Sequence, residues 1–177
     1  MKVILLLRHA KSAWGHPGLD DHDRALNERG ERAAEAMADH IVRNAPRPDL
    51  ILCSTSLRTR QTLAPLLHRL ASPAPPIALE KGLYLASEET LLERLRALPE
   101  QARTVLLIGH NEGIGELAVS MATSGPLADL GALQQKFPTA ALATLRVADQ
   151  PWRDLARGTG ELASFVRPRD LLPAYRV

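Results

Sequence analysis

Four residues, each following an apolar run of the sequence, have side chains suited to phosphoryl chemistry. Arg8 and His9 come directly after the run over residues 3–7, in the stretch LLLRHAKSAW. A guanidinium presents a planar fork of donors that matches phosphate oxygens. An imidazole can act as a nucleophile, or as a general acid or base near neutral pH. Arg58 and His110 follow two later apolar runs, so the four together indicate a site for an anionic group.

The elements that carry these residues are predicted to form an α/β fold with a mostly parallel sheet. Residues 2–8, 49–53 and 104–108 are short apolar runs without alternation, which is typical of strands buried on both faces. Helical patterns separate them, as in a parallel sheet. Ligands bind beyond the carboxyl ends of such strands. We therefore expect Arg8-His9, the start of the helix that contains Arg58, and His110 to converge on one surface.

The remaining elements are predicted from periodicity and capping residues. Helices are expected at about 28–44, from the capping residues 54–56 to about 71, at 88–98 and at about 113–123. Pro65 predicts a kink or a restart in the second of them. Further strands are expected at 77–80, 141–147 and 161–166, an irregular segment at 124–138, and an exposed tail at 168–177.

Composition indicates a globular protein and argues against nucleic-acid binding. The 177 residues fit one domain, and no composition break within 1–177 marks a second. Aromatic residues make up 3 %, and no dense Lys/Arg block accompanies the net charge of +2, so we expect no nucleic-acid partner. No apolar stretch approaches membrane-spanning length. Cys53 is the only cysteine, which fits a reducing compartment, so we expect a cytoplasmic protein.

A pocket of two guanidiniums and two imidazoles suits phosphoryl transfer. Preorganised cations stabilise the charge on the equatorial oxygens of the transferred group. One imidazole can attack phosphorus and form a phosphohistidine intermediate that water then hydrolyses. The helix starts after Ser56 and Asn111 can add backbone N–H donors for the phosphoryl oxygens.

Several motifs in order resemble the histidine phosphatase superfamily, and most closely its SixA-type phosphohistidine phosphatases. They are LLLRHAKSAW, DRALNERG at 23–30, DLILCSTSLRTRQT at 49–62, LY at 83–84, VLLIGHNEG at 105–113 and FPTAALATL at 137–145. The resemblance covers most of the chain and implies a three-layer α/β/α fold of the phosphoglycerate mutase type. The sequence departs from the family pattern at Ala10, a position where other members commonly have glycine.

The resemblance also implies a role for individual residues. His9 corresponds to the phosphoryl acceptor, Arg8 and Arg58 to the phosphate clamp, and His110 to a second imidazole that contacts the phosphoryl group. Arg24 and Ser12 correspond to supporting positions in substrate binding. For Arg24, a salt bridge with one of the nearby aspartates, at positions 20, 21 and 23, is an equal alternative.

The leaving-group side of the site is less defined in the sequence. Superfamily members that cleave esters use a carboxylate to protonate the departing oxygen, and Glu88 is the candidate by position. The sequence favours the alternative for Glu88, an ordinary first-turn helix acid that the helix dipole stabilises. Imidazole, with a pKa near 6.5, departs from phosphorus with less help than an alkoxide. A weak acid position therefore favours phosphohistidine in a protein as substrate over a small phosphate ester with Glu88 as acid.

Other chemistries fit the sequence less well. Cysteine phosphatases need five residues between cysteine and arginine, whereas four separate Cys53 from Arg58. No His or Asp pair has the spacing of a metal site, and no nucleotide-binding motif is present, so neither a metal nor another cofactor is expected. A mutase is disfavoured by the short chain. A pocket that binds a phosphorylated partner without turnover stays open as an alternative, and the oligomeric state is not indicated.

Overall fold

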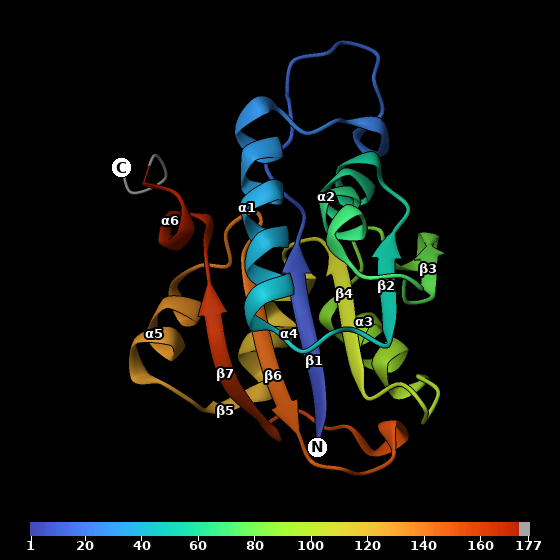
Figure 1. The fold of residues 1–177 in the computed structure, drawn as a ribbon, viewed down its shortest axis with the longest axis vertical. Helices are drawn as coiled ribbons and strands as arrows, with labels where there is room; N and C mark the ends of the chain where they lie inside the picture. The colour runs from blue at the N-terminus through green and yellow to red at the C-terminus, as the bar shows by residue number, and fades with distance from the viewer. Residues whose placement is uncertain (174–177) are drawn as a thin grey trace.

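The computed structural model describes residues 1–173, in which seven strands form one sheet with helices on both faces (Figure 1). The strand order is β3-β2-β4-β1-β6-β7-β5. The strands are β1 Lys2–Arg8, β2 Leu50–Ser54, β3 Ile77–Glu80, β4 Thr104–Gly109, β5 Ala122–Ser124, β6 Leu142–Val147 and β7 Gly160–Val166. The helices are α1 Glu28–Asn44, α2 Leu57–Arg69, α3 Glu88–Arg96, α4 Gly113–Met121, α5 Leu127–Gln135 and α6 Pro168–Leu171, with 3₁₀ turns at η1 Asp21–Asp23, η2 Lys81–Leu83 and η3 Trp152–Asp154.

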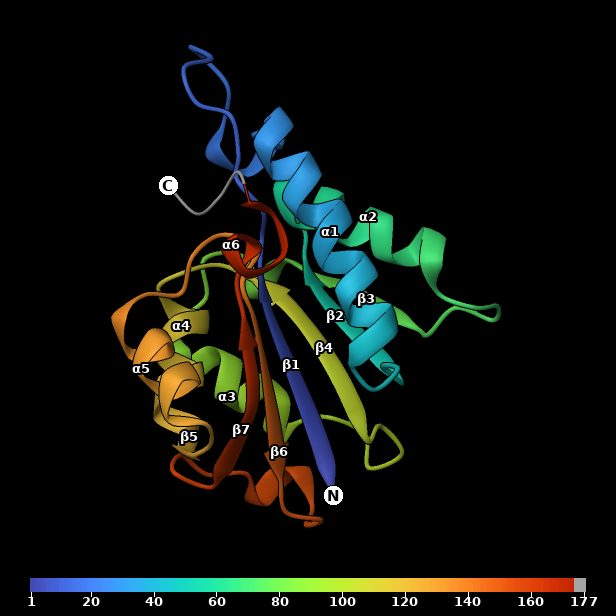
Figure 2. The same cartoon turned by 60° about the vertical axis from the view of Figure 1, so that its left-hand side comes forward.

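The three-layer α/β architecture with a mostly parallel sheet is confirmed. Helices α1 and α2 cover one face of the sheet, and α3, α4 and α5 cover the other (Figure 2). Strand β1 pairs in parallel with β4, which pairs in parallel with β2. Only β6 runs antiparallel to its two neighbours, β1 and β7. The carboxyl ends of β1, β2 and β4 therefore meet at one edge of the sheet, as the sequence predicts.

Strand β1 is central because its side chains are apolar on both faces. Ile4 and Leu6 pack into the core beneath α3 and α4, whereas Leu5 and Leu7 pack into the core beneath α1 and α2. All four are at most 2 % exposed. Burial of this kind stabilises the fold by roughly 1.5–3 kcal/mol for each such side chain. The polar residues that follow β1 are thus held at the end of a rigid element.

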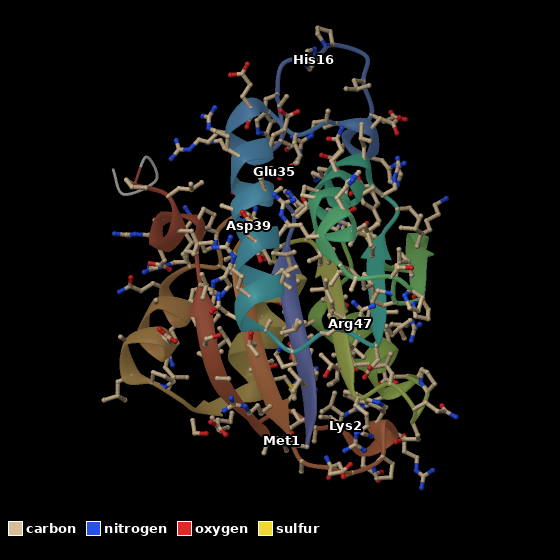
Figure 3. The ribbon with its side chains drawn as sticks, in the orientation of Figure 1. Met1, Lys2, His16, Glu35, Asp39 and Arg47 are labelled. Carbon is tan, nitrogen blue, oxygen red and sulfur yellow. The ribbon has the colours of Figure 1, made fainter. Side chains whose placement is uncertain are left out.

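The predicted helix starts are found at their capping residues. The side chains of Asn27, Ser56 and Ser87 accept from the backbone N–H groups three residues ahead, at the starts of α1, α2 and α3. Arg69 in α2 pairs with Glu35 and Asp39 of α1, at 2.5 and 2.6 Å, and so ties the two helices together. Figure 3 shows Glu35 and Asp39 on α1.

Three expectations about the chain differ from the structure. The segment 124–138 is not irregular, since it completes β5 and forms α5, whose first residue follows Pro126. The restart expected at Pro65 is absent, because the helix continues through it to Arg69, and the alternative of a kink stays a prediction. The expected exposed tail begins as helix α6, which packs against α1 and buries Pro168. Positions 174–177 of that tail lie outside the described residues. Within residues 1–173, no helix is long and apolar enough to cross a membrane.

Gly30 allows α1 to touch the loop that follows the Arg8-His9 pair. A Cβ at this position would lie 2.0 Å from the backbone oxygen of Lys11, which also accepts from the N–H of Asn27. Gly30→Ala is therefore expected to lower the free energy of unfolding by roughly 1–3 kcal/mol, as overpacking does, measured by urea denaturation. Gly131→Ala in α5 is the control, because nothing lies within 4 Å of its added Cβ. Equal stability of Gly30→Ala and the unchanged protein would contradict this packing.

Candidate active site

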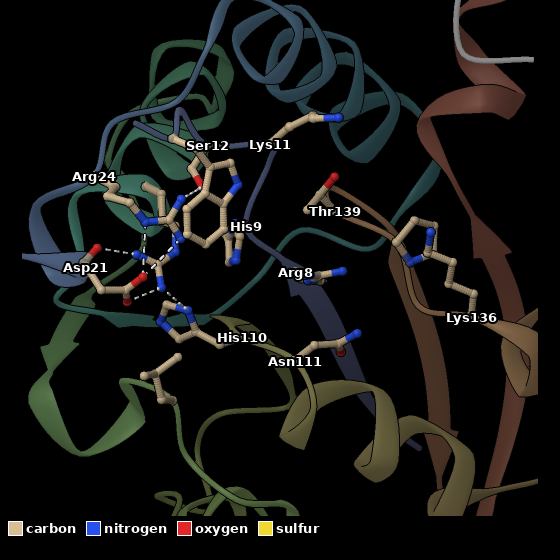
Figure 4. A pocket seen from close by; sticks show the side chains of 14 residues that line it. Arg8, His9, Lys11, Ser12, Asp21, Arg24, His110, Asn111, Lys136 and Thr139 are labelled. Atoms are coloured by element: carbon tan, nitrogen blue, oxygen red, sulfur yellow. Dashed lines mark hydrogen bonds and ion pairs between the residues drawn. The ribbon is translucent and has the colours of Figure 1, made fainter. Parts of the chain in front are cut away.

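The three strand ends form a pocket of about 530 Å³. Arg8 and His9 lie at the end of β1, Arg58 lies in the first turn of α2 after β2, and His110 follows β4 (Figure 4). Fourteen residues line the pocket: Arg8, His9, Lys11, Ser12, Trp14, Asp21, Arg24, Arg58, Leu85, His110, Asn111, Lys136, Pro138 and Thr139. Five of them are Lys or Arg and only one carries a carboxylate, so the pocket is built for an anion.

His9 is held as a neutral imidazole with one nitrogen fixed. Its Nδ1 lies 2.7 Å from the backbone oxygen of Ala10, which can only accept, so Nδ1 carries the proton. Burial lowers the pKa of His9 to about 3, with the charge of Arg58 adding to the effect and the hydrogen bond to Ala10 opposing it. At neutral pH the Nε2 lone pair is therefore available, as a nucleophile requires.

His110 faces His9 across the pocket and is tied to the second strand end. The two ring centroids lie 5.3 Å apart. Nε2 of His110 lies 2.8 Å from the Ser54 hydroxyl, and Nδ1 lies 3.4 Å from Nη2 of Arg58. Burial and the charge of Arg58 lower the pKa of His110 to about 4. A bound phosphoryl dianion would act in the opposite direction and favour the protonated ring.

Arg8, which is half-buried, and Arg58, which is buried, have donors suited to an oxyanion. Nη1 of Arg8 donates to the backbone oxygen of Phe137 at 3.0 Å, and burial together with Arg58 lowers its pKa. Within residues 1–173, the Nε atoms of Arg8 and Arg58 are the buried side-chain nitrogens or oxygens with no hydrogen-bond partner in the protein. Buried donors of this kind call for an explanation. Both side chains line the pocket, where a phosphoryl group could accept charge-assisted hydrogen bonds from their guanidiniums.

Asp21 joins Arg24 and Arg58, two of the three arginines that line the pocket. Its carboxylate accepts from Nη2 of Arg58 at 2.9 Å and from Nε of Arg24 at 3.0 Å, and the Tyr84 hydroxyl donates to it as well. Partial burial raises the pKa of this carboxyl, but the three hydrogen bonds outweigh burial and hold the pKa well below its usual range. Asp21 thus stays ionised and orients Arg58 and Arg24.

Comparison with known proteins places this geometry in a family. The model of the histidine phosphatase superfamily (branch 1) matches residues 4–84, which contain Arg8, His9, Arg24 and Arg58. A solved structure from Agrobacterium tumefaciens, assigned as the phosphohistidine phosphatase SixA, is 35 % identical with a TM-score of 0.78, over 94 % of this chain and 98 % of the other. The chain belongs to the histidine phosphatase superfamily.

Further relatives cover the chain at similar length. A structure from Nakamurella, also assigned as SixA, is 28 % identical with a TM-score of 0.80, over 94 % of this chain and 96 % of the other. An uncharacterised protein of Mycobacterium tuberculosis is 38 % identical over 165 residues, which span 92 % of this chain and all of the relative. Superfamily membership and these neighbours support a phosphatase, and not a module that only binds.

The structure of this histidine phosphatase brings together all but one of the residues that the sequence singles out. The four residues predicted as catalytic line the pocket with Ser12, Arg24 and Asn111. The salt-bridge alternative for Arg24 is confirmed, because it pairs with Asp21. Arg24 also lines the pocket, where its Nη1 donates to the Ser12 hydroxyl at 2.5 Å, and its role in substrate binding stays a prediction. The Asn111 amide donates to the Phe137 backbone oxygen at 3.0 Å and accepts from Gly115, so this side chain is fixed at the start of α4.

Glu88 is the exception, since its carboxylate does not line the pocket. Its Oε1 accepts from the Ser120 hydroxyl and from Nε of Arg157, both at 2.6 Å, and these hydrogen bonds lower its pKa. The first turn of α3 faces α4 and the loop before β7. Glu88 is thus an acid of the first helical turn, which is the alternative to a catalytic acid. The structure therefore gives Glu88 no position from which to protonate a leaving group.

Sequence reasoning missed the roles of Asp21 and Tyr84 in the pocket wall. Asp21 stands three residues before Arg24, a spacing that signals only a local salt bridge. Tyr84 belongs to the short LY motif, and its ring lies edge-on to His110 at 5.3 Å between centroids. Long-range contacts of this kind leave no mark in local sequence. Among the described residues, no cluster of three or more His, Cys, Asp or Glu side chains is arranged to hold a metal ion.

The lowered pKa values of the two pocket histidines predict a distinct pH dependence. Both imidazoles should stay neutral as pH falls from 7 to about 5, a range in which a free imidazole becomes protonated. The unfolded chain takes up these protons first, so the free energy of unfolding should decrease as pH falls from about 6.5 toward 4. Imidazole ¹⁵N NMR of the phosphate-free protein checks the first point directly. Titration of the His9 ring near pH 6.5 would contradict this electrostatic description.

Proposed function

We propose that this histidine phosphatase hydrolyses phosphohistidine in proteins, with Nε2 of His9 as the phosphoryl acceptor. In the first step the lone pair of Nε2 attacks phosphorus, the N–P bond of a substrate phosphohistidine whose other ring nitrogen carries a proton breaks, and the substrate departs as a neutral imidazole. In the second step water attacks phosphorus, the P–Nε2 bond breaks, and inorganic phosphate and a proton are released. His9 ends in the form in which it began, and no step needs a cofactor.

The cations of the pocket have defined tasks in this route. Arg8 and Arg58, which both line the pocket, would bind the non-bridging oxygens through their guanidinium groups. His110 would donate to a third oxygen when the incoming dianion favours its protonated form. Because these groups are fixed by β1, α2 and β4 before substrate arrives, they stabilise the developing charge without reorganisation.

The choice of substrate rests on the ionisation state of the one carboxylate that lines the pocket. Asp21 is held as an anion by three donors, so it has no proton to give to an alkoxide leaving group. Glu88 lies elsewhere. An imidazole leaving group with a pKa near 6.5 needs far less protonation than an alcohol. The names of the two SixA neighbours agree with a phosphohistidine substrate.

A substrate panel tests the proposal. Rates are compared for a phosphohistidine peptide, the matching phosphoserine peptide and an activated aryl phosphate. We expect kcat/KM for phosphohistidine to exceed that for phosphoserine by at least about 100-fold, which is the lower range of what a positioned acid supplies. The aryl ester should fall between them. Equal turnover of phosphoserine and phosphohistidine would overturn the substrate assignment while leaving the superfamily intact.

Replacement of Glu88 tests the ester alternative separately. We expect Glu88→Gln to change kcat/KM for every member of the panel by less than about threefold, because its carboxylate binds Ser120 and Arg157 away from the pocket. Steady-state kinetics on an alkyl and an aryl ester give the answer. A loss confined to the alkyl ester, whose leaving group needs an acid, would assign Glu88 the acid role after all.

A further inference from the structure

Four exposed residues surround the mouth of the phosphate pocket. Lys11 and Trp14 come from the loop after β1, Leu85 from the turn between η2 and α3, and Lys136 from the end of α5. All four line the pocket and are exposed, and we call them the rim. None of them is needed to hold the phosphoryl group in the proposed reaction, so these four side chains are available for another role.

The two rim lysines carry charge that the protein does not neutralise. In the part of the chain that the structure describes, neither ammonium group has a carboxylate within 4.0 Å. The one carboxylate of the pocket, Asp21, is already shared between Arg58 and Arg24. Lys11 and Lys136 lie on different sides of the pocket mouth (Figure 4). The entrance therefore presents two free positive charges to an approaching molecule.

The apolar rim residues are exposed in fixed positions. Trp14 is 75 % exposed, yet its ring lies 3.6 Å from the guanidinium carbon of Arg24, which Asp21 and Ser12 hold in place. Leu85 is 55 % exposed and has a left-handed backbone with φ of 51°, a conformation that side-chain-bearing residues rarely adopt. Strained residues of this kind gather at binding sites. A preorganised tryptophan beside free cations is typical of a protein-binding surface.

We propose that the rim is a docking surface for the acidic face of the protein that carries the phosphohistidine. Carboxylates flanking the phosphorylated residue would pair with Lys11 and Lys136, while apolar groups of the same partner would contact Trp14 and Leu85. This inference rests on the proposed function. It adds that the residues around the substrate's phosphohistidine are acidic. Electrostatic complementarity of this sort speeds encounter and selects among partners.

Two phosphohistidine peptides of equal length test the proposal, one with glutamate and one with glutamine on both sides of the phosphorylated residue. We expect kcat/KM of the unchanged protein to be at least tenfold higher for the acidic peptide, with the advantage shrinking as salt rises. In the double variant Lys11→Glu, Lys136→Glu the preference should vanish or reverse. Lys81→Glu is the matched control, since Lys81 is exposed but does not line the pocket, and it should keep the preference.

The outcomes separate the docking surface from the catalytic proposal. Equal turnover of the two peptides, or an unchanged preference in the double lysine variant, would overturn the docking surface and leave phosphohistidine hydrolysis standing. Failure to hydrolyse either peptide would overturn both. Tryptophan fluorescence gives an independent arm in the His9→Ala variant, because Trp152 is buried and Trp14 is exposed. Binding of the acidic peptide should change the emission of Trp14, and no change at saturation would contradict contact with the rim.

Discussion

Replacement of His9 by alanine is expected to lower kcat by about 10⁴-fold or more on every phosphoryl substrate, because the bond-forming atom is removed. Charge is not the cause of the loss, since burial keeps this imidazole neutral at working pH. The variant should still bind phosphate through Arg8 and Arg58. Steady-state kinetics and phosphate titration calorimetry measure the two effects separately.

His68→Ala is the control for His9→Ala, because His68 is exposed on α2 and lies outside the pocket. It should retain full activity. Near-normal turnover by His9→Ala would show that another group attacks phosphorus, whereas loss of phosphate binding together with turnover would indicate that the pocket had collapsed.

Replacement of Arg58 by alanine has the second largest expected effect. Arg58 is 2 % exposed, its guanidinium reaches Asp21 and His110, and its side chain lines the pocket that would hold the phosphoryl group. We expect kcat/KM to fall by about 10³-fold, equivalent to about 4 kcal/mol of transition-state stabilisation. Arg58→Lys should recover little of this, because an ammonium keeps the charge but lacks the planar fork.

Removal of a buried charge can also affect folding, so thermal unfolding accompanies the Arg58 kinetics. Arg60→Ala, on the exposed side of the same helix, provides the matched loss of one guanidinium without loss of a pocket residue. A folded Arg58→Ala protein with kcat/KM within tenfold of the unchanged enzyme would contradict a role for Arg58 in the phosphate clamp.

The sequence predicts the centre of this protein better than its periphery. Strand β1 is recognisable because Ile4, Leu5, Leu6 and Leu7 are buried on both faces and leave no alternation. Parallel strands place their carboxyl ends together, so the convergence of His9, Arg58 and His110 follows from topology. By contrast, α5 contains Gly131 in its interior and has no polar side chain to cap its start, and both features weaken a helical prediction.

What the sequence does not predict depends on contacts between distant segments. The carboxylate of Asp21 meets Arg58 and Tyr84, which are 37 and 63 positions away. By position alone Glu88 is a candidate for acid catalysis, but the fold pairs it with Arg157, 69 positions away. Local patterns report burial and chain direction, whereas the partner of a single polar side chain is decided by the packed fold.

Chemical trapping of the phosphorylated enzyme tests the central claim most directly. The protein is mixed with excess phosphohistidine peptide, quenched in alkaline denaturant during the first turnover, because phosphohistidine survives alkali, and mapped by tandem mass spectrometry. The account predicts a phosphoryl group on His9, and none in the His9→Ala variant. A phosphoryl group on another residue, or release of phosphate in the first turnover with no phosphorylated enzyme, would contradict it.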